Sequence, residues 1–483
     1  MHLTSLILFF IVITLGIFTS LTLYSLDNNS LLYYGDSISH LIIARKMTDW
    51  QDAGLHQLGT VWLPLPHILL AIPSSIDGLF FSGFAGLVLN LPALAITTMI
   101  LYKILLKHLS KENAFLTSLL YPTNPNILYQ SLTAMTETLL LLFFVLSAFY
   151  LFRFIESRNN KYIILTSIFI VFTTLCRYEA WFLPFILIPY SYIYSIKDKY
   201  KTILFSLLSL SGIIFWLLWN LYYYDDPFEF VNAEFYSASW QAEIRDINDT
   251  LFLNPLNIFK IYSLTMLIIY GPLVVSLINI SKDYLYLTIL PLFTLISLVI
   301  GIGEISFWFN SRFLILIAPL LIFLVSRFSN QKIFYLFVIT IIYSLFMTIT
   351  TYDETFDNKI GIVTYIDAKT GFFHDRAPVV IGEFMHSNYD DGNIMIITGS
   401  MQEHKIMINS WIRLERYDEI IESSKWKNSF KEPWLYNKWL IISSRADSDA
   451  SNVARYWLNN IEIIYKYYNK IYEYDNISIF KLK

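Results

Sequence analysis

The chain has 483 residues, of which 55% are hydrophobic and only 15% are charged. This composition is typical of an integral membrane protein rather than of a soluble globular one. The net charge of −4 gives no indication of nucleic-acid binding, so we expect no nucleic-acid partner. Cys176 is the only cysteine, which excludes an intrachain disulfide and a cysteine-based zinc site.

Long apolar runs fill the chain up to residue 352. The first, residues 3–24, predicts a retained transmembrane helix, because no basic segment precedes it and no small-residue cleavage site follows it. A spanning helix needs about 20 mostly apolar residues, and about eleven runs approach that length. They are 3–24, 79–102, 114–130, 137–153, 162–177, 181–196, 202–222, 259–280, 284–302, 313–327 and 333–351.

The loops between these runs alternate in charge. Every second loop is basic, with Lys103, Lys107 and Lys111, then Arg153, Arg158 and Lys161, then Lys197, Lys199 and Lys201, then Lys282, then Arg327 and Lys332. The positive-inside rule places these loops and the N-terminus in the cytoplasm. The long loops 25–78 and 223–258, which are acidic and aromatic, are therefore expected outside, together with the C-terminal segment.

The segment 353–483 differs in kind from the membrane part, 1–352. Residues 393–398 and 438–443 read as short buried strands, 450–458 as a helix, and 461–482 as a terminal hairpin. We interpret this segment as a small extracytoplasmic α/β domain.

The first outer loop begins with YGDSISHLIIARK, residues 34–46. Asp36 and His40 have i, i+4 spacing, so a helix would place them on one side. A simpler interpretation is that Asp36 is a helix-end residue favoured by the helix dipole. The following stretch, GTVWLPLPH, has two prolines and cannot form a regular helix throughout. Irregular backbone at a membrane surface is tolerated where it is buried or lines a cavity, so we expect this loop to be structured.

Together, YGDSISHLIIARK and LGTVWLPLPH resemble the first outer loop of the GT-C superfamily of membrane glycosyltransferases. The similarity is greatest to the protein O-mannosyltransferase and aminoarabinose-transferase type of archaea and bacteria. It covers the membrane part, with the best matches in 34–70, 131–140, 174–184 and 306–320. The resemblance implies a polytopic α-helical GT-C fold of about 11 transmembrane helices. It also implies Asp36 as the catalytic residue of this loop, with His40, Arg45, Trp62 and His67 as neighbouring substrate-binding residues.

Three further segments fit this family pattern. Glu137 stands at the outer end of a helix, where the resemblance implies a second active-site acid that orients the acceptor; a dipole-favoured helix-end residue is the alternative. Arg177, Tyr178 and Glu179 match a RYEGW-like element, although Ala180 replaces its glycine, and a local ion pair is the alternative. Arg312 lies beside aromatic residues at an outer face, as an interfacial anchor would. In the family, an arginine in this region contacts the donor phosphate, which a guanidinium can bind through two oxygens.

A metal site is the competing interpretation of Asp36, His40 and His67. Two residues at ligand-like spacing are weak support, because no third ligand is fixed by the sequence. The acidic motifs of the related metal-dependent oligosaccharyltransferases are also absent from this sequence. We therefore favour a site without a metal or other cofactor, and leave a divalent metal open.

The resemblance implies transfer of a sugar from a polyprenyl phosphate donor to a hydroxyl group of a protein, glycolipid or glycan acceptor at the bilayer surface. Asp36 would act as the base, and Arg312 or Arg177 would stabilise the departing phosphate. One base and one departing anion predict inversion at the anomeric carbon. Two alternatives are a transporter or flippase for a lipid-linked sugar, and a non-catalytic glycolipid-binding relative. The first predicts ionisable groups deep within helices and an internal repeat, which the sequence does not show.

Overall fold

The computed structural model describes residues 2–185, 199–231, 255–280, 287, 311–352, 361–398, 400–419, 431–444 and 456–483. The chain divides into two compact units, which we call the helical unit and the sheet unit. The helical unit comprises Met1–Asp27, Gly59–Leu69 and Gly86–Asp367. The sheet unit comprises Asn28–Leu58, Leu70–Ala85 and Ala368–Lys483. The first outer loop is thus shared between the units, whereas the sequence predicted a single boundary near residue 352.

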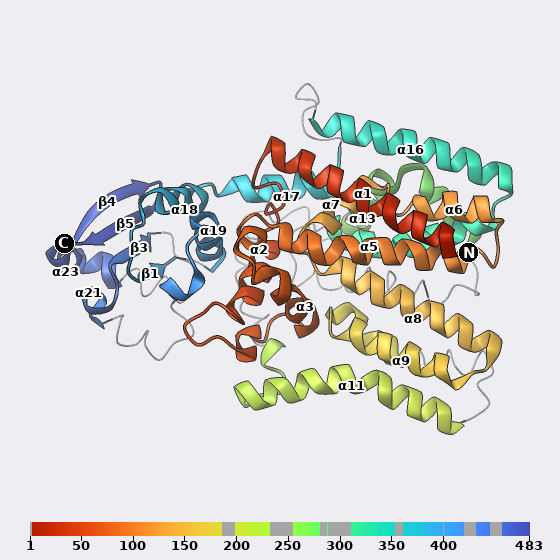
Figure 1. The fold of residues 1–483 in the computed structure, drawn as a ribbon, viewed down its shortest axis with the longest axis horizontal. Helices are drawn as coiled ribbons and strands as arrows, with labels where there is room; N and C mark the ends of the chain where they lie inside the picture. Colours follow the sequence, from red (N-terminus) through yellow and green to blue (C-terminus); the bar gives the residue numbers. More distant parts are fainter. Residues whose placement is uncertain are drawn as a thin grey trace. The chain divides into compact units, whose positions relative to one another are not determined.

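The helical unit consists of long apolar helices and shorter helical segments (Figure 1). Its α-helices are α1 (His2–Leu26), α5 (Phe84–Leu105), α6 (Lys111–Leu119), α7 (Pro125–Leu132), α8 (Glu137–Ser157), α9 (Asn160–Thr174), α11 (Lys199–Tyr224), α13 (Pro255–Tyr270), α15 (Ala318–Leu324) and α16 (Asn330–Tyr352). Its 3₁₀ segments are η2 (Tyr178–Phe182), η3 (Gly271–Asn279), η5 (Ser311–Ile317) and η6 (Val325–Arg327). Helices α3 (Pro64–Ser74) and α17 (Val363–His374) each cross from one unit into the other.

Six segments of the described residues are long enough and apolar enough to cross a membrane. They are Leu3–Leu26, Phe84–Leu105, Glu137–Ser157, Leu204–Tyr224, Tyr262–Asn279 and Asn330–Thr351. The chain is therefore a multi-pass membrane protein. The predicted run 284–302 falls outside the described residues, apart from Leu287, as do residues 186–196 of the predicted run 181–196 and most of the loop 223–258.

The count of about eleven spans is not confirmed, and two predicted runs take a different form. Residues 114–130 fold as α6 and α7 rather than as one helix, because Pro122 and Pro125 interrupt the run and the Asn124 side chain caps α7. Residues 313–327 form η5, α15 and η6. The run 162–177 is α9, an apolar helix of 15 residues.

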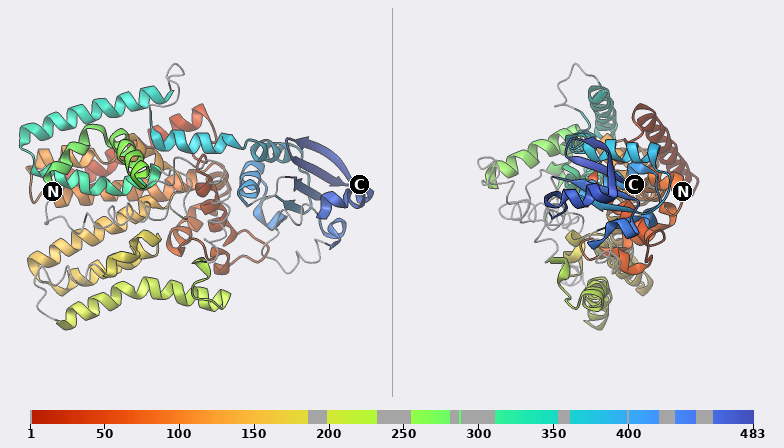
Figure 2. Two further views of the ribbon diagram at one scale, coloured as in Figure 1. Left: turned by 180° about the vertical axis from the view of Figure 1, so that it is seen from behind. Right: turned by 90° about the vertical axis from the view of Figure 1, so that its left-hand side faces the viewer.

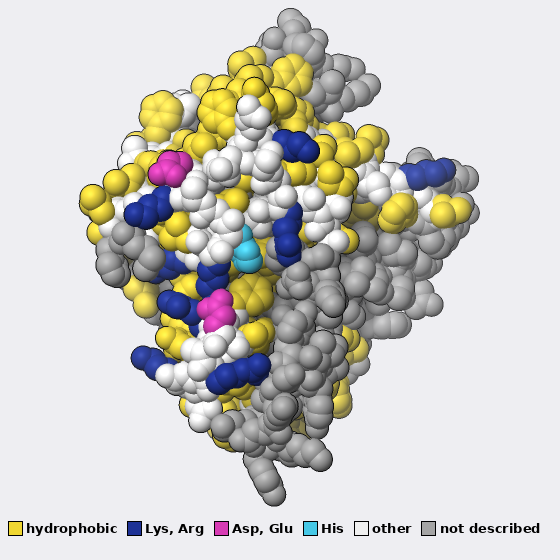
Figure 3. All heavy atoms as spheres, turned by 90° about the vertical axis from the view of Figure 1, so that its right-hand side faces the viewer, with side chains coloured by type: hydrophobic (Ala, Val, Ile, Leu, Met, Phe, Trp, Pro, Cys, Tyr) yellow, Lys and Arg dark blue, Asp and Glu magenta, His cyan; other side chains and the backbone are white. Residues whose placement is uncertain are grey.

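The helices pack side by side within the helical unit. Helix α9 lies between α8 and α11, and α16 packs on α6 and η3 (Figure 2). At one end of α8 lie Arg153 and Arg158, close in sequence to Lys161 at the start of α9. Figure 3 shows that Lys and Arg side chains gather on this end of the molecule. Glu137 begins α8, so it lies at the opposite end of that helix.

The sheet unit contains a five-stranded mixed sheet with the strand order β2-β1-β3-β5-β4. Its strands are β1 (Ile394–Ile397), β2 (Tyr417–Glu419), β3 (Trp439–Ser443), β4 (Tyr468–Tyr474) and β5 (Ile477–Leu482). Strand β1 is parallel to β2 and β3, whereas β5 is antiparallel to β3 and β4. The predicted buried strands correspond to β1 and β3, and the predicted hairpin to β4 and β5. The first third of that hairpin segment is instead a helix, α23 (Ile461–Tyr467). Of the predicted helix 450–458, only its last three residues are described.

Helices complete the sheet unit. They are α2 (Gly35–Lys46), α4 (Asp77–Phe81), α18 (Ala377–Asn388), α19 (Ser400–Ser410) and α21 (Pro433–Tyr436), with the 3₁₀ segments η1 (Leu55–Leu58) and η7 (Leu414–Arg416). Helix α19 packs on α18 and on α2. The core behind the sheet includes Met395, Leu440, Trp457 and Phe480. Loop residues that follow the first helix therefore share a unit with the C-terminal segment.

Candidate active site

The helical unit brings together two acids and two arginines. Glu137 is fully buried in the first turn of α8, and its Oε1 accepts a hydrogen bond of 2.9 Å from Arg177 Nη1. The same oxygen lies 3.4 Å from Arg312 Nε. Glu137 Oε2 is buried and makes no hydrogen bond with a described residue. We call Glu137, Arg177, Glu179 and Arg312 the charged cluster; its formal charges cancel.

Arg177 connects the two acids of the charged cluster. Its Nε and Nη2 donate to the Glu179 carboxylate, with Nη2 2.7 Å from Oε1, while Nη1 also donates to Thr136 Oγ1 at 3.1 Å. Burial raises the pKa of Glu179, but the charge and hydrogen bonds of Arg177 outweigh this effect, and the net pKa is lowered. Both carboxylates are therefore held by guanidinium groups.

Both arginines of the cluster lie against the ring of Phe313. The guanidinium carbon of Arg177 is 5.0 Å from the centroid of this ring, and that of Arg312 is 5.2 Å from it. Arg312 Nη1 also donates to Met135 Sδ at 3.9 Å, and a thioether is a weak acceptor. The two guanidinium groups therefore converge on one carboxylate and one aromatic ring.

Backbone contacts fix the turn that leads into Glu137. The side-chain amide of Asn90, on α5, donates to the carbonyls of Thr133 and Met135, both at 2.7 Å. A Cβ at Gly86, one turn earlier on α5, would lie 2.3 Å from the backbone nitrogen of Ala134. The close approach of α5 to this turn therefore requires glycine at position 86. A carboxylate in the first turn of α8 is also favoured by the helix dipole.

Tyr178 holds the loop segment Gly59–Leu69 inside the helical unit. Its hydroxyl donates to the Val61 carbonyl at 3.1 Å and accepts from Trp216 Nε1 at 3.1 Å. Its ring stacks on Phe230 with centroids 5.2 Å apart. Tyr178 thus joins η2, α11 and the first outer loop.

Trp62 and His67 lie in this same loop segment. Their rings stack with centroids 6.3 Å apart, and His67 Nδ1 is 3.0 Å from the Leu63 carbonyl oxygen. His67 is fully buried, which lowers its pKa to about 4 although the backbone hydrogen bond opposes this change. The ring is therefore neutral near pH 7.

Asp36, His40 and Arg45 belong to the sheet unit. Asp36 is half-buried in the first turn of α2, and His40 is buried one turn later on the same helix, as the i, i+4 spacing predicted. Arg45 lies in the last turn of α2 and donates hydrogen bonds to Asp49, to the carbonyl of Ser74 and to Asp77. Its side chain therefore links α2 to the end of α3 and the start of α4.

The structure thus groups four of the residues proposed from the sequence, Glu137, Arg177, Glu179 and Arg312, and connects Tyr178, Trp62 and His67 within the same unit. Sequence reasoning missed Asn90 and Thr136, because an amide or a hydroxyl in an apolar segment has many structural uses. Gly86 gave no signal either. Among the described residues, no group of three or more His, Cys, Asp or Glu side chains is placed to hold a metal ion.

Residues 64–219 match the family model of dolichyl-phosphate-mannose-protein mannosyltransferases. This range includes Glu137, Arg177 and Glu179, but neither Asp36 nor Arg312. No curated protein sequence matches the chain.

The fold of nearly the whole chain is similar to that of a protein of known structure, ArnT. ArnT from Cupriavidus metallidurans in the apo state matches with a TM-score of 0.56 and 10% identity, over 97% of both chains. The same protein bound to undecaprenyl phosphate gives a TM-score of 0.57, also at 10% identity and over 97% of both chains. The apo oligosaccharyltransferase of Archaeoglobus fulgidus gives 0.48 at 11% identity, over 97% of this chain and 74% of the other. The predicted resemblance to the GT-C membrane glycosyltransferases is therefore confirmed by the family match and by the ArnT-like fold.

Proposed function

We propose that the protein is an integral-membrane glycosyltransferase that transfers a sugar from a polyprenyl phosphate donor to a hydroxyl acceptor on the extracytoplasmic side, with inversion. The observation that carries this proposal is the convergence of Arg177 and Arg312 on Glu137 at the end of a long apolar helix. A lipid-linked phosphate requires cationic hydrogen-bond donors at the depth where the apolar helices end. The undecaprenyl phosphate named for the ArnT structure is a compound of this class.

Arg177 and Arg312 are the proposed phosphate-binding residues. A guanidinium group offers paired donors that match two phosphate oxygens, and its charge stabilises the anion that leaves. Phosphate oxygens are stronger acceptors than the sulfur of Met135, which now receives a hydrogen bond from Arg312. Donor binding would therefore improve the hydrogen bonding of Arg312.

Glu137 is proposed as a positioning residue for the two arginines. Its Oε1 receives both guanidinium groups, so it orients them and offsets their mutual repulsion. Glu179 has a parallel role at Arg177 alone. This role differs from the contact with the acceptor that the sequence resemblance implied for Glu137.

Asp36 is proposed as the general base. Its carboxylate takes the proton from the acceptor hydroxyl while that oxygen forms a bond to the anomeric carbon. The bond from the anomeric carbon to the phosphate oxygen breaks at the same time, and polyprenyl phosphate leaves with the electron pair. A single displacement of this kind inverts the anomeric configuration. His40, one turn from Asp36, is proposed to contact the same substrate.

The orientation of the protein is proposed from the positive-inside rule. Lys and Arg side chains gather at the ends of α5 and α8 and at the starts of α6 and α9, the face shown in Figure 3. We assign this end and the N-terminus to the cytoplasm. Glu137 and the charged cluster would then face outside, as the C-terminal α/β segment would.

The test is sugar transfer by purified protein supplied with a panel of polyprenyl phosphate sugars and with protein, glycolipid and glycan acceptors. Asp36→Asn keeps the shape of the side chain and removes the base, so transfer should fall by about 10²-fold or more, while donor binding persists. Asp52→Asn is the matched control, because Asp52 is an exposed carboxylate of the same loop. Normal transfer by Asp36→Asn would show that Asp36 is only a helix-end residue.

A further inference from the structure

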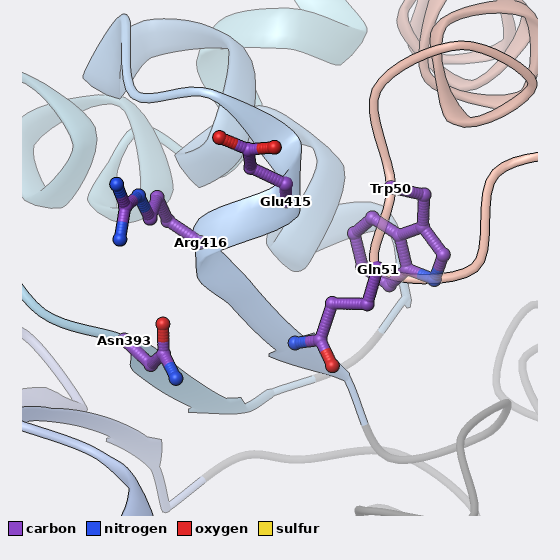
Figure 4. Close-up of a pocket in the computed structure, with 5 residues that line it drawn as sticks. All are labelled: Trp50, Gln51, Asn393, Glu415 and Arg416. Carbon is purple, nitrogen blue, oxygen red and sulfur yellow. The ribbon is translucent and has the colours of Figure 1, made fainter.

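A pocket of about 350 Å³ opens in the sheet unit, lined by Trp50, Gln51, Asn393, Glu415 and Arg416. We call it the Trp50 pocket (Figure 4). Its volume lies at the lower end of the range of small-molecule sites, about 300–1,000 Å³. Four of the five lining side chains are polar, so the pocket is unlike the apolar sites that bind lipid tails or aromatic cofactors.

The fold places these residues together by strand pairing. Asn393 directly precedes β1 and Arg416 directly precedes β2, and the parallel register pairs Ile394 with Tyr417. Asn393 and Arg416 are therefore neighbours at the amino end of the sheet. Gln51 is fixed to the same edge, because its Nε2 donates to the carbonyl of Tyr417 at 2.9 Å.

The polar groups of the pocket offer both donors and acceptors. Gln51 Oε1 is buried and has no hydrogen-bond partner among the described residues. Asn393 Nδ2 donates a hydrogen bond of 3.3 Å to the Tyr436 carbonyl, and the side-chain oxygen of Asn393 is a second acceptor in the pocket. Arg416 supplies a cationic donor from an exposed position.

Charge and shape limit the class of ligand. The lining holds one acid, Glu415, whose carboxylate lies 3.4 Å from Arg413 Nη1, and one cation, Arg416. A polyanionic phosphate would meet repulsion from this carboxylate. An apolar peptide side chain would leave the amides without partners, which is costly. The Trp50 side chain is only 6% exposed, and Lys46 Nζ lies 4.3 Å from its ring centroid, so it closes the pocket without presenting an open stacking face.

We propose that the Trp50 pocket binds a pyranose unit of a carbohydrate acceptor. Sugar hydroxyls donate and accept at once, as the amides and charged groups of the pocket require. The binding of carbohydrate stands on the pocket alone. The statement that this carbohydrate is the acceptor rests on the proposed function, and it favours a glycan over a protein acceptor.

The test is ligand-detected NMR on the full-length protein in detergent, without any donor. The probes are methyl α-mannopyranoside, methyl β-glucopyranoside, methyl glucuronide, a linear mannotriose and a Ser/Thr-rich hexapeptide. We expect saturation transfer to at least one sugar. The dissociation constant should rise at least about tenfold in the double variant Asn393→Ala/Arg416→Ala, because two hydrogen-bonding side chains are lost.

The matched control is Asn388→Ala/Arg376→Ala, which removes the same residue types from exposed positions of the sheet unit outside the pocket. It should bind the sugar as the wild type does. Binding of no sugar, binding of the peptide alone, or equal binding by both double variants would each overturn the proposal. Because no donor is present, this experiment measures sugar binding independently of transfer. A protein that binds sugar here but transfers none in the separate assay with the donor panel would contradict the proposed function and leave the pocket assignment intact.

Discussion

Arg177 Nη1 lies 2.9 Å from Glu137 Oε1, and the second arginine of the cluster, Arg312, approaches the same oxygen at 3.4 Å. One buried carboxylate thus anchors two cations from different parts of the chain. Removing one partner of such a buried group leaves uncompensated charge, which costs about 3–5 kcal/mol. If the arginines bind the donor phosphate as proposed, stability and donor binding therefore depend on the same residue, Glu137.

Glu137→Ala should lower both the thermal stability of the protein and its affinity for polyprenyl phosphate. The two arginines would lose their shared acceptor and repel each other, at a cost of about 3 kcal/mol in folding free energy. Thermal unfolding in detergent and a binding titration measure the two effects. Glu112→Ala, which removes an exposed acid at the start of α6, is the control and should change neither. Unchanged donor affinity in Glu137→Ala would contradict the positioning role.

Arg312→Lys should weaken binding of polyprenyl phosphate by about tenfold, because a lysine keeps the charge but loses the paired donors of the guanidinium. Transfer at saturating donor should fall as well, since the leaving phosphate is less well stabilised. Titration with polyprenyl phosphate and initial rates at several donor concentrations separate the two effects. Arg327→Lys, an exposed arginine at the opposite end of α15, serves as the control. If both variants bind polyprenyl phosphate with the same affinity, Arg312 is an interfacial anchor and not a phosphate-binding residue.

The residues of the charged cluster could be predicted from the sequence, but their contacts could not. Glu137, Arg177 and Arg312 stand out because ionisable groups beside apolar helices are rare and costly. Their mutual arrangement depends on how η2, η5 and α8 pack, and local spacing does not encode this. Asn90, whose amide holds the turn before Glu137, looks like any polar residue in a long helix.

The long helices followed from apolar length, whereas their interruptions depended on local chemistry. Residues 114–130 are apolar enough for one span, but Pro125 and the Asn124 cap begin a separate helix, α7. The division of the first outer loop between two units was not predictable either. It rests on tertiary contacts such as that of Arg45 with Asp77, 32 residues further along the chain, which no periodicity reveals.

Gly86→Ala should destabilise the protein by about 1–3 kcal/mol, because the added methyl group overpacks α5 against the backbone at Ala134. The displaced turn carries Glu137, so transfer should fall more than the change in stability alone explains. Gly78→Ala is the matched control, since nothing lies within 4 Å of a Cβ at Gly78 in α4. It should leave stability unchanged or slightly raised. Thermal unfolding and transfer assays on both variants make the comparison. Equal behaviour of the two would show that α5 can move away from the turn at little cost.

The buried His67 should make folding stability depend on pH below neutrality. Burial lowers its pKa to about 4, against 6.5 for an unperturbed histidine. Above pH 6.5 the ring is neutral in the folded and unfolded chains, so its full contribution to stability is present. As the pH falls from 6.5 towards 4, the unfolded chain takes up the proton first, and up to about 3 kcal/mol of stability is lost.

Thermal unfolding at pH 7.5 and pH 5 measures this effect. His67→Gln should lower stability at pH 7.5, because the buried stacking with Trp62 is lost. It should also reduce the difference in thermal stability between pH 7.5 and pH 5, since glutamine does not titrate. His108→Gln, which changes an exposed histidine after α5, is the control. It should show the same difference in thermal stability between pH 7.5 and pH 5 as the wild type. If His67→Gln keeps it too, the pH dependence arises from other groups and the ring of His67 is hydrated in the folded protein.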